Sequence, residues 1–205
     1  IAVQYERRDN VLELESIVLC EHIGAILVAL YEKRHSEANA LLPKLLAHPA
    51  FAFAPITIWK LGLTAQQNHA TWLETMVVST NFSTLANWLI EQSQALAYTP
   101  LEYMLDEILG NVEPRDTFTS PLMNYFFAPE NLSVKPESYL AHLEGLRAIR
   151  NKLQEYQPSE TPMLQSFLEF IRLHRQMGSP VTSMRGSGSS SSQKAVTLMT
   201  AHKSK

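Results

Sequence analysis

The chain of 205 residues has a single cysteine, only seven glycines and no long apolar run. Cys20 alone excludes a disulfide framework and a cysteine-based zinc site, and it suits a reducing, cytoplasmic compartment. No stretch of about 18 apolar residues is present and the N-terminus lacks a signal-peptide pattern, so neither a membrane span nor export is expected. Scarce glycine leaves few residues suited to tight hairpin turns.

An excess of charge of one sign is also lacking. Lysine and arginine total 17 against 20 acidic residues, for a net charge of −3. This balance excludes a polyanion binder with a wholly basic surface, but it leaves room for a local basic patch. The length allows roughly 70% of the unfolded surface to be buried, so the chain can build a core without staples. Because it starts at Ile1 and stops at Lys205, we expect a piece of a longer protein.

Helical periodicity dominates the sequence. Apolar residues keep one face from Leu12 to Leu30, and Ser36 is the expected N-cap of the next helix. Gly62 and Gly110 are expected to end helices, and Pro43 to kink or shorten one. The remaining signals predict an all-α body with helices over 37–47, 55–61, 70–78, 83–97, 100–109, 122–127, 136–156 and 162–177.

The two ends of the chain do not fit this helical pattern. Ile1–Tyr5 and Ala195–Thr200 are short and β-prone, while the GSGSSSS-containing stretch before the second of them has the composition of a flexible tether. We predict a multi-helix insertion whose ends lie close together, because both join one sheet that is mostly absent. β-bridges between Val3 and 196–199 are compatible with this arrangement but are not required by it. The predicted parts are an exit segment 1–10, a helical subdomain 11–177, a Ser/Gly-rich loop 178–193 and a return strand with a following motif 194–205.

The segment Val196–Lys205, VTLMTAHKSK, carries the clearest chemical signal. A strand there runs into Thr-x-His-x-Ser-Lys. Such a junction presents hydroxyl, imidazole and ammonium groups at the carboxyl edge of a sheet, where phosphates are commonly held. The alternative interpretation is an ordinary polar tail after an edge strand.

This segment resembles the beginning of motif V of UvrD/Rep/PcrA-type superfamily 1 DNA helicases. Thr200, His202, Ser204 and Lys205 match the family pattern Thr-x-His-x-Ser/Ala-Lys in order. In that family a largely helical subdomain, called 2B, is inserted into the second RecA-like domain, and motif V follows soon after. The opening IAVQYERRDNVLELESIV is similar to the entry into 2B, with 5–8 (YERR) in place of the family's glycine and aromatic pairs.

The resemblance implies that the parent is an ATP-dependent DNA helicase or translocase of DNA repair or recombination, with ATP and Mg as cofactors. It implies that Thr200, His202, Lys203 and Lys205 bind single-stranded DNA there. Its partners would be single-stranded DNA, a duplex junction and regulatory proteins, with no membrane. The family's Gly-Ile-Gly turn, used against duplex DNA, has no counterpart in the glycine-free 48–56, so duplex contact by that turn is not predicted.

The chain itself has no Gly-x-x-x-x-Gly-Lys-Ser/Thr loop and no Asp-Glu metal pair after an apolar strand. We therefore expect this chain to be a catalytically inactive accessory subdomain, with no catalytic residues, cofactor or metal of its own. A helical protein–protein interaction module unrelated to DNA remains the alternative. A phosphate loop upstream and Gly-Leu-Glu directly after Lys205 would decide for the helicase.

Structural roles are the favoured interpretation for the other polar and aromatic candidates. We expect surface or capping histidines, tryptophans in the core, an inert Cys20 and two solvated charged faces, although the basic face could also meet phosphates. The residues concerned are His48, His69, His142 and His174; Trp59, Trp72 and Trp88; Glu102, Asp106 and Glu107; and Arg147, Arg150, Lys152, Arg172 and Arg175.

Overall fold

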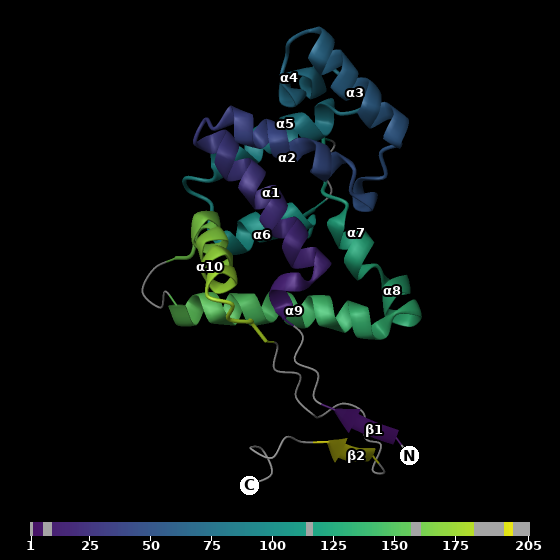
Figure 1. The fold of residues 1–205 in the computed structure, drawn as a ribbon, viewed down its shortest axis with the longest axis vertical. Coiled ribbons are helices and arrows are strands. Elements are labelled where there is room, and N and C mark those ends of the chain that lie inside the picture. Colours follow the sequence, from purple (N-terminus) through teal and green to yellow (C-terminus); the bar gives the residue numbers. More distant parts are fainter. Residues whose placement is uncertain (1, 6–9, 114–116, 157–160, 183–194, 199–205) are drawn as a thin grey trace.

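The computed structural model describes residues 2–5, 10–113, 117–156, 161–182 and 195–198. Its described part is a body of helices with one pair of short strands, β1 (Ala2–Tyr5) and β2 (Ala195–Leu198) (Figure 1). The predicted all-α class is therefore confirmed. The helices are η1 Val11–Glu13, α1 Glu15–Tyr31, α2 His35–Leu46, η2 Pro49–Phe51, α3 Pro55–Gln67, α4 Trp72–Val77, α5 Ser83–Ala95, α6 Leu101–Leu109, α7 Leu122–Phe127, α8 Pro129–Val134, α9 Pro136–Tyr156 and α10 Leu164–Gln176.

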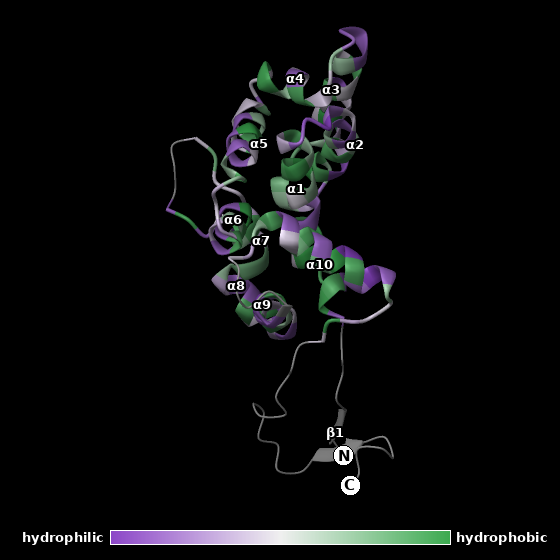
Figure 2. Ribbon diagram, turned by 90° about the vertical axis from the view of Figure 1, so that its left-hand side faces the viewer, coloured by the Kyte–Doolittle hydropathy of each residue, from purple (hydrophilic) through white to green (hydrophobic). Residues whose placement is uncertain are grey.

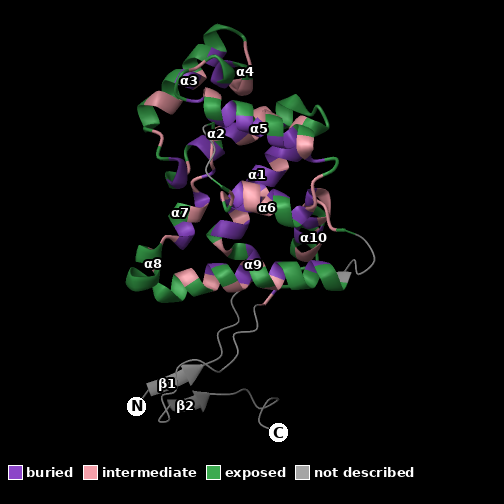
Figure 3. Cartoon of the chain, turned by 180° about the vertical axis from the view of Figure 1, so that it is seen from behind, coloured by how far each residue is buried: buried purple, intermediate pink, exposed green. Residues whose placement is uncertain are grey.

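Helix α1 forms the centre of the body and packs against α2, α5, α6, α9 and α10. Its side chains are buried on almost every side, from Ile17 through Ile23 to Ala29. A helix that is apolar all round must be surrounded by other elements, and the hydrophobic character of α1 in Figure 2 and its burial in Figure 3 agree with this. Helices α6 and α10 are amphipathic: they bury Met104 and Phe167, among others, and expose Glu102 and Arg172.

Two residues predicted to mark helix ends have other roles. Gly62 does not end α3, which continues to Gln67. A Cβ atom at Gly62 would lie 2.8 Å from the Trp72 ring, so this glycine permits close packing of α4 on α3. Ser36 is not an N-cap, because α2 begins at His35, two residues before the expected start, with Arg34 as its N-cap.

Pro43 lies inside α2 and does not end it, since the helix runs on to Leu46. A proline removes one backbone hydrogen bond and crowds the preceding turn, and this position is close enough to the end that little helix follows it. The short helix α8 was not expected from the sequence, although Pro129 occupies the first-turn position that prolines favour.

The chain enters and leaves the helical body at the same place. The Val11 amide donates to the Val181 carbonyl at 2.7 Å, and the Val181 amide donates to the Asn10 side-chain oxygen at 3.2 Å. Asn10 and Thr182 form an antiparallel bridge. Beyond this junction β1 and β2 pair in parallel, with Val3 opposite Val196. The prediction that the two ends lie together is confirmed.

The conformation of Gly110 and its close contact with Ser120 can be tested by substitution. Gly110 ends α6 in the left-handed region with φ of +81°, and an added Cβ would meet the Ser120 carbonyl oxygen at 2.1 Å. We predict that Gly110→Ala lowers the free energy of unfolding by about 3 kcal/mol or more, because backbone strain and a backbone clash add together. Urea denaturation followed by circular dichroism measures this.

Gly178→Ala is the matched control. Gly178 also has a positive φ of +61°, but nothing lies within 4 Å of an added Cβ. The Gly178→Ala variant should be destabilised by backbone strain alone, by about 1 kcal/mol. Equal losses in the two variants would contradict the close contact at Gly110.

Candidate functional site

The predicted DNA-binding residues follow strand β2. The structure describes that strand over Ala195–Leu198, and the rest of the predicted segment, including Thr200, His202, Lys203 and Lys205, lies outside the described residues. Because β1 and β2 are parallel, the carboxyl ends of both strands meet at one edge. The register therefore places Tyr5 and Leu198 opposite each other at the edge from which the motif continues.

The junction between the strands and the helical body is stabilised by side-chain contacts as well as by backbone hydrogen bonds. Asn10 caps η1, because its side-chain oxygen accepts the Leu12 amide at 3.2 Å. Arg175 near the end of α10 donates to the Glu21 carboxylate on α1 at 2.6 Å and to the Leu12 carbonyl at 3.3 Å. These contacts join the first and last elements of the body, so the entry and exit of the chain are fixed relative to each other.

Four cations of α9 and α10 each have a carboxylate within ion-pair distance. These exposed pairs agree with the favoured interpretation of a solvated face, while the alternative of a phosphate-facing strip stays untested. The pairs are Arg150–Glu102 and Lys152–Glu155 at 2.7 Å, Arg172–Glu169 at 2.5 Å and Arg175–Glu21 at 2.6 Å. Glu102, predicted as part of a solvated acidic face, is thus also paired.

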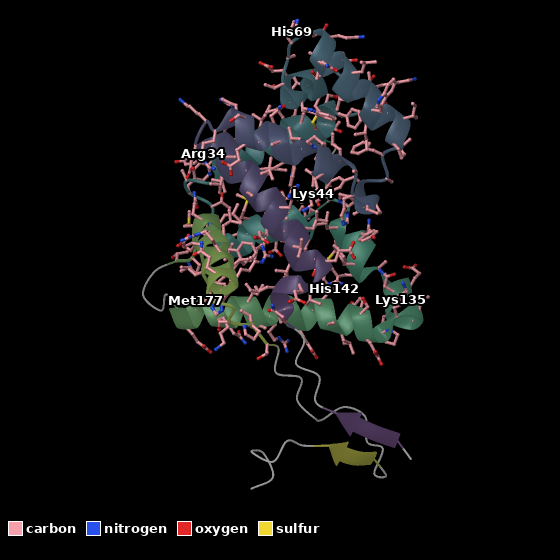
Figure 4. The ribbon with its side chains drawn as sticks, in the orientation of Figure 1. Arg34, Lys44, His69, Lys135, His142 and Met177 are labelled. Atoms are coloured by element: carbon pink, nitrogen blue, oxygen red, sulfur yellow. The ribbon has the colours of Figure 1, made fainter. Side chains whose placement is uncertain are left out.

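Three of the four histidines match the predicted surface or capping roles. His48 accepts the Ala50 amide at the start of η2 and contacts Glu15 at 3.1 Å. His69 lies exposed between α3 and α4 (Figure 4). His174 bonds the Ser179 carbonyl at 3.1 Å. Among the described residues, no group of three histidine, cysteine or acidic side chains is arranged to hold a metal ion.

His142 differs from this prediction, because it is buried and paired with Ser16. The Ser16 hydroxyl and the His142 Nδ1 are 2.8 Å apart, and the ring packs against Phe126 at 4.8 Å between centroids. A serine beside an imidazole is a combination used for nucleophilic catalysis. Here Ser16 is fully buried and His142 is 8% exposed, so no substrate reaches the pair. Its role is to join α9 to α1.

The cysteine and two of the tryptophans behave as predicted. Cys20 is fully buried, and desolvation raises the pKa of its thiol to about 12, so it is an inert thiol. Trp88 belongs to the core and Trp72 packs against it. Trp59 contradicts the prediction of a core tryptophan, because 61% of it is exposed. The apolar neighbours of Trp59 in sequence did not reveal which face of α3 would be covered.

Buried histidines predict a pH dependence of stability. Desolvation lowers the pKa of both His22 and His142 below the ordinary value of 6.5. The unfolded chain then binds more protons than the folded protein below that value. The contribution of these two neutral histidines to the free energy of unfolding is therefore complete above about pH 6.5. It is lost as the pH falls from there through their lowered pKa values in the folded protein.

We predict that a His22→Gln/His142→Gln variant loses part of this pH dependence, since glutamine does not titrate in this range. Urea-unfolding free energies at about pH 7.5 and about pH 5.5 give the difference for each protein. Each single variant should fall between the wild type and the double variant. A double variant that keeps the full wild-type difference would rule out these two side chains as its source.

In comparisons with known proteins, no family model, no curated protein and no solved structure matches the chain. Within the described ranges, no helix combines the length and the apolar character that a membrane crossing requires. The functional conclusion therefore depends on the junction geometry and on the residues that follow β2.

Proposed function

We propose that this chain is an accessory helical subdomain of a superfamily 1 DNA helicase, inserted into a RecA-like sheet just before motif V. The observation that carries the proposal is the junction, where the Val11 amide meets the Val181 carbonyl at 2.7 Å and β1 pairs with β2. A domain inserted within another needs its two ends side by side. The proposed host is a superfamily 1 helicase because the VTLMTAHKSK segment resembles the beginning of motif V.

The parallel pairing of β1 and β2 supports a host sheet. Parallel strands need a long crossover between them, and the helical body is such a connection. Parallel sheets are normally covered on both faces, and a pair of short strands is marginal on its own. Further strands beside β1 and β2 would supply the missing partners.

In the parent, Thr200 and His202 hold the single-stranded DNA backbone. A strand end followed by a loop offers a hydroxyl, backbone amides and an imidazole to one phosphate, and such contacts position DNA without reading its sequence. Lys203 and Lys205 add salt-dependent attraction. ATP hydrolysis takes place elsewhere in the parent, and this subdomain acts by positioning DNA or regulatory proteins.

We predict that Thr200→Ala/His202→Ala in the full-length parent weakens single-stranded DNA binding by about tenfold or more, because phosphate hydrogen bonds are lost. DNA-stimulated ATP turnover should fall with it, whereas ATP turnover without DNA should not change. Fluorescence anisotropy with a labelled oligonucleotide and a coupled ATPase assay measure the two quantities.

Thr80→Ala/His69→Ala is the matched control, since it removes the same residue types from exposed positions in the helical body. It should bind DNA as the wild type does. If the Thr200/His202 variant also keeps wild-type affinity and turnover, motif V is misassigned.

The junction generates a second prediction for the parent. Replacing 11–181 with a short Gly/Ser linker should leave a folded parent that still hydrolyses ATP, because the two ends of the removed segment are hydrogen-bonded neighbours. Thermal unfolding and ATP turnover test this.

Removing only 15–109 is the comparison, because it deletes α1 and exposes the apolar surfaces that packed on it. That variant should aggregate or melt early. If excision of the whole insertion damages the parent as much as this partial deletion does, the body is not an insertion.

A further inference from the structure

An open apolar groove lies at the end of the body opposite the strands. It has a volume of about 450 Å³ and is lined by residues of α3, the start of α4 and the residue after α2. Figure 1 shows that α3 and α4 lie at the end of the body far from β1 and β2. No charged side chain lines the groove. The walls are Pro55, Ile58, Trp59 and Leu63 from α3, Ala47 after α2, and Trp72 from α4.

The outer face of helix α3 is apolar, and two of its side chains, Trp59 and Leu63, also line the groove. The inner face of α3 buries Leu61 and Ala65 against the body. On the outside, Ile56 is 57% exposed, Trp59 61% and Leu63 37%. These three positions follow the i, i+3, i+7 spacing of a helix face that packs against another helix. The outer face of α3 therefore has the pattern of a contact surface without a partner among the described residues.

The position of α4, which forms one wall of the groove, is fixed by several contacts. The Trp72 ring lies over Gly62, where an added Cβ would come within 2.8 Å of it, so only glycine allows this approach. The Trp72 amide donates to the Asn39 side-chain oxygen on α2 at 2.6 Å. Thr71 and Glu74 form a capping box that fixes the start of α4. A surface that is already ordered loses little entropy when it binds.

The segment that forms the groove carries positive charge only. Residues 38–73 contain no aspartate or glutamate, and they include the exposed Lys44 and Lys60. Neither lysine is in an ion pair within the described part of the chain. The carboxylate of Glu74, directly after this segment, accepts two hydrogen bonds from Thr71 at 2.7 and 2.8 Å and lines a separate hollow with Leu73. The segment that forms the groove thus has two exposed lysines without an ion-pair partner among the described residues.

We propose that this groove docks an amphipathic helix of a partner protein, with aliphatic anchors on one face and acidic residues beside them. The aliphatic side chains would fill the groove between Trp59 and Trp72, as in other helix-in-groove complexes. The acidic residues would lie against Lys44 and Lys60. Complementary charge at the rim selects the partner, while the buried anchors supply most of the affinity.

Two other occupants fit the surface less well. A second copy docking face to face through α3 would bring Lys60 near its own equivalent, with no acid from 38–73 to compensate. DNA needs several cations along its backbone, and this surface provides only two lysines. An acidic amphipathic helix matches both the apolar spacing and the charge.

The probe is a labelled, tryptophan-free peptide of about 18 residues with leucines at i, i+3 and i+7 and flanking glutamates, which is slightly longer than α3. A second peptide has lysine in place of every glutamate. Anisotropy titrations with the 205-residue chain should show that the acidic peptide binds about fivefold to tenfold more tightly than the basic one at low salt.

Three variants locate the binding. Trp59→Ala should weaken the acidic peptide about thirtyfold, the loss typical of a central aromatic anchor. Lys60→Glu should reduce or reverse the preference between the two peptides. Tyr103→Ala is the control, because Tyr103 is an aromatic side chain 67% exposed on α6, outside the groove. It should bind as the wild type does.

Several results would overturn the proposal. These are equal affinity for both peptides, no loss in Trp59→Ala, or an equal loss in Tyr103→Ala. Binding of a labelled oligonucleotide that depends on Trp59, without peptide binding, would assign the groove to nucleic acid. Concentration-dependent dimers in sedimentation that Trp59→Ala abolishes would assign it to a second copy. Circular dichroism of each variant excludes unfolding as the cause.

Discussion

The backbone hydrogen bond from Val11 to Val181 is the constraint on which the rest of the structure depends. It joins residues far apart in the sequence at the point where the chain enters and leaves the helices. Asn10 and Arg175 strengthen this closure with side-chain contacts to both neighbouring elements. With the two ends held together, β1 and β2 can pair in parallel, and the body between them becomes a single crossover connection.

Helix α1 transmits this constraint into the core. It starts directly after the closure and is surrounded by other helices, so every element that packs on it is placed relative to the junction. Its two buried polar groups have partners: Ser16 bonds His142, and His22 bonds the Leu41 carbonyl at 3.0 Å. Buried polar groups are tolerated when they are hydrogen-bonded. These bonds set the positions of α9 and α2 along α1.

A helix end that is set by adjacent residues could be predicted from the sequence, whereas side-chain roles that are set by contacts between helices could not. Gly110 ends α6 as expected because a left-handed cap is a property of a few adjacent residues. The prediction that Gly62 ends α3 was wrong, because the role of this glycine is set by Trp72, which belongs to another helix. The exposure of Trp59 and the burial of His142 likewise depend on which neighbours cover them. The adjacency of the ends was predictable from two β-prone segments, while the DNA-binding role of Thr200 and His202 stays a prediction.

The net charge of −3 conceals an uneven distribution of charge along the body. On α9 and α10, four cations are paired with Glu21, Glu102, Glu155 and Glu169. At the opposite end, the segment 38–73 has lysines and no acids. Rim charges act over roughly a Debye length, about 10 Å at moderate salt, so a partner at the groove experiences the local lysines far more than distant acidic residues. Because recognition depends on this local field, an acidic partner can select the groove of a protein that is itself acidic overall.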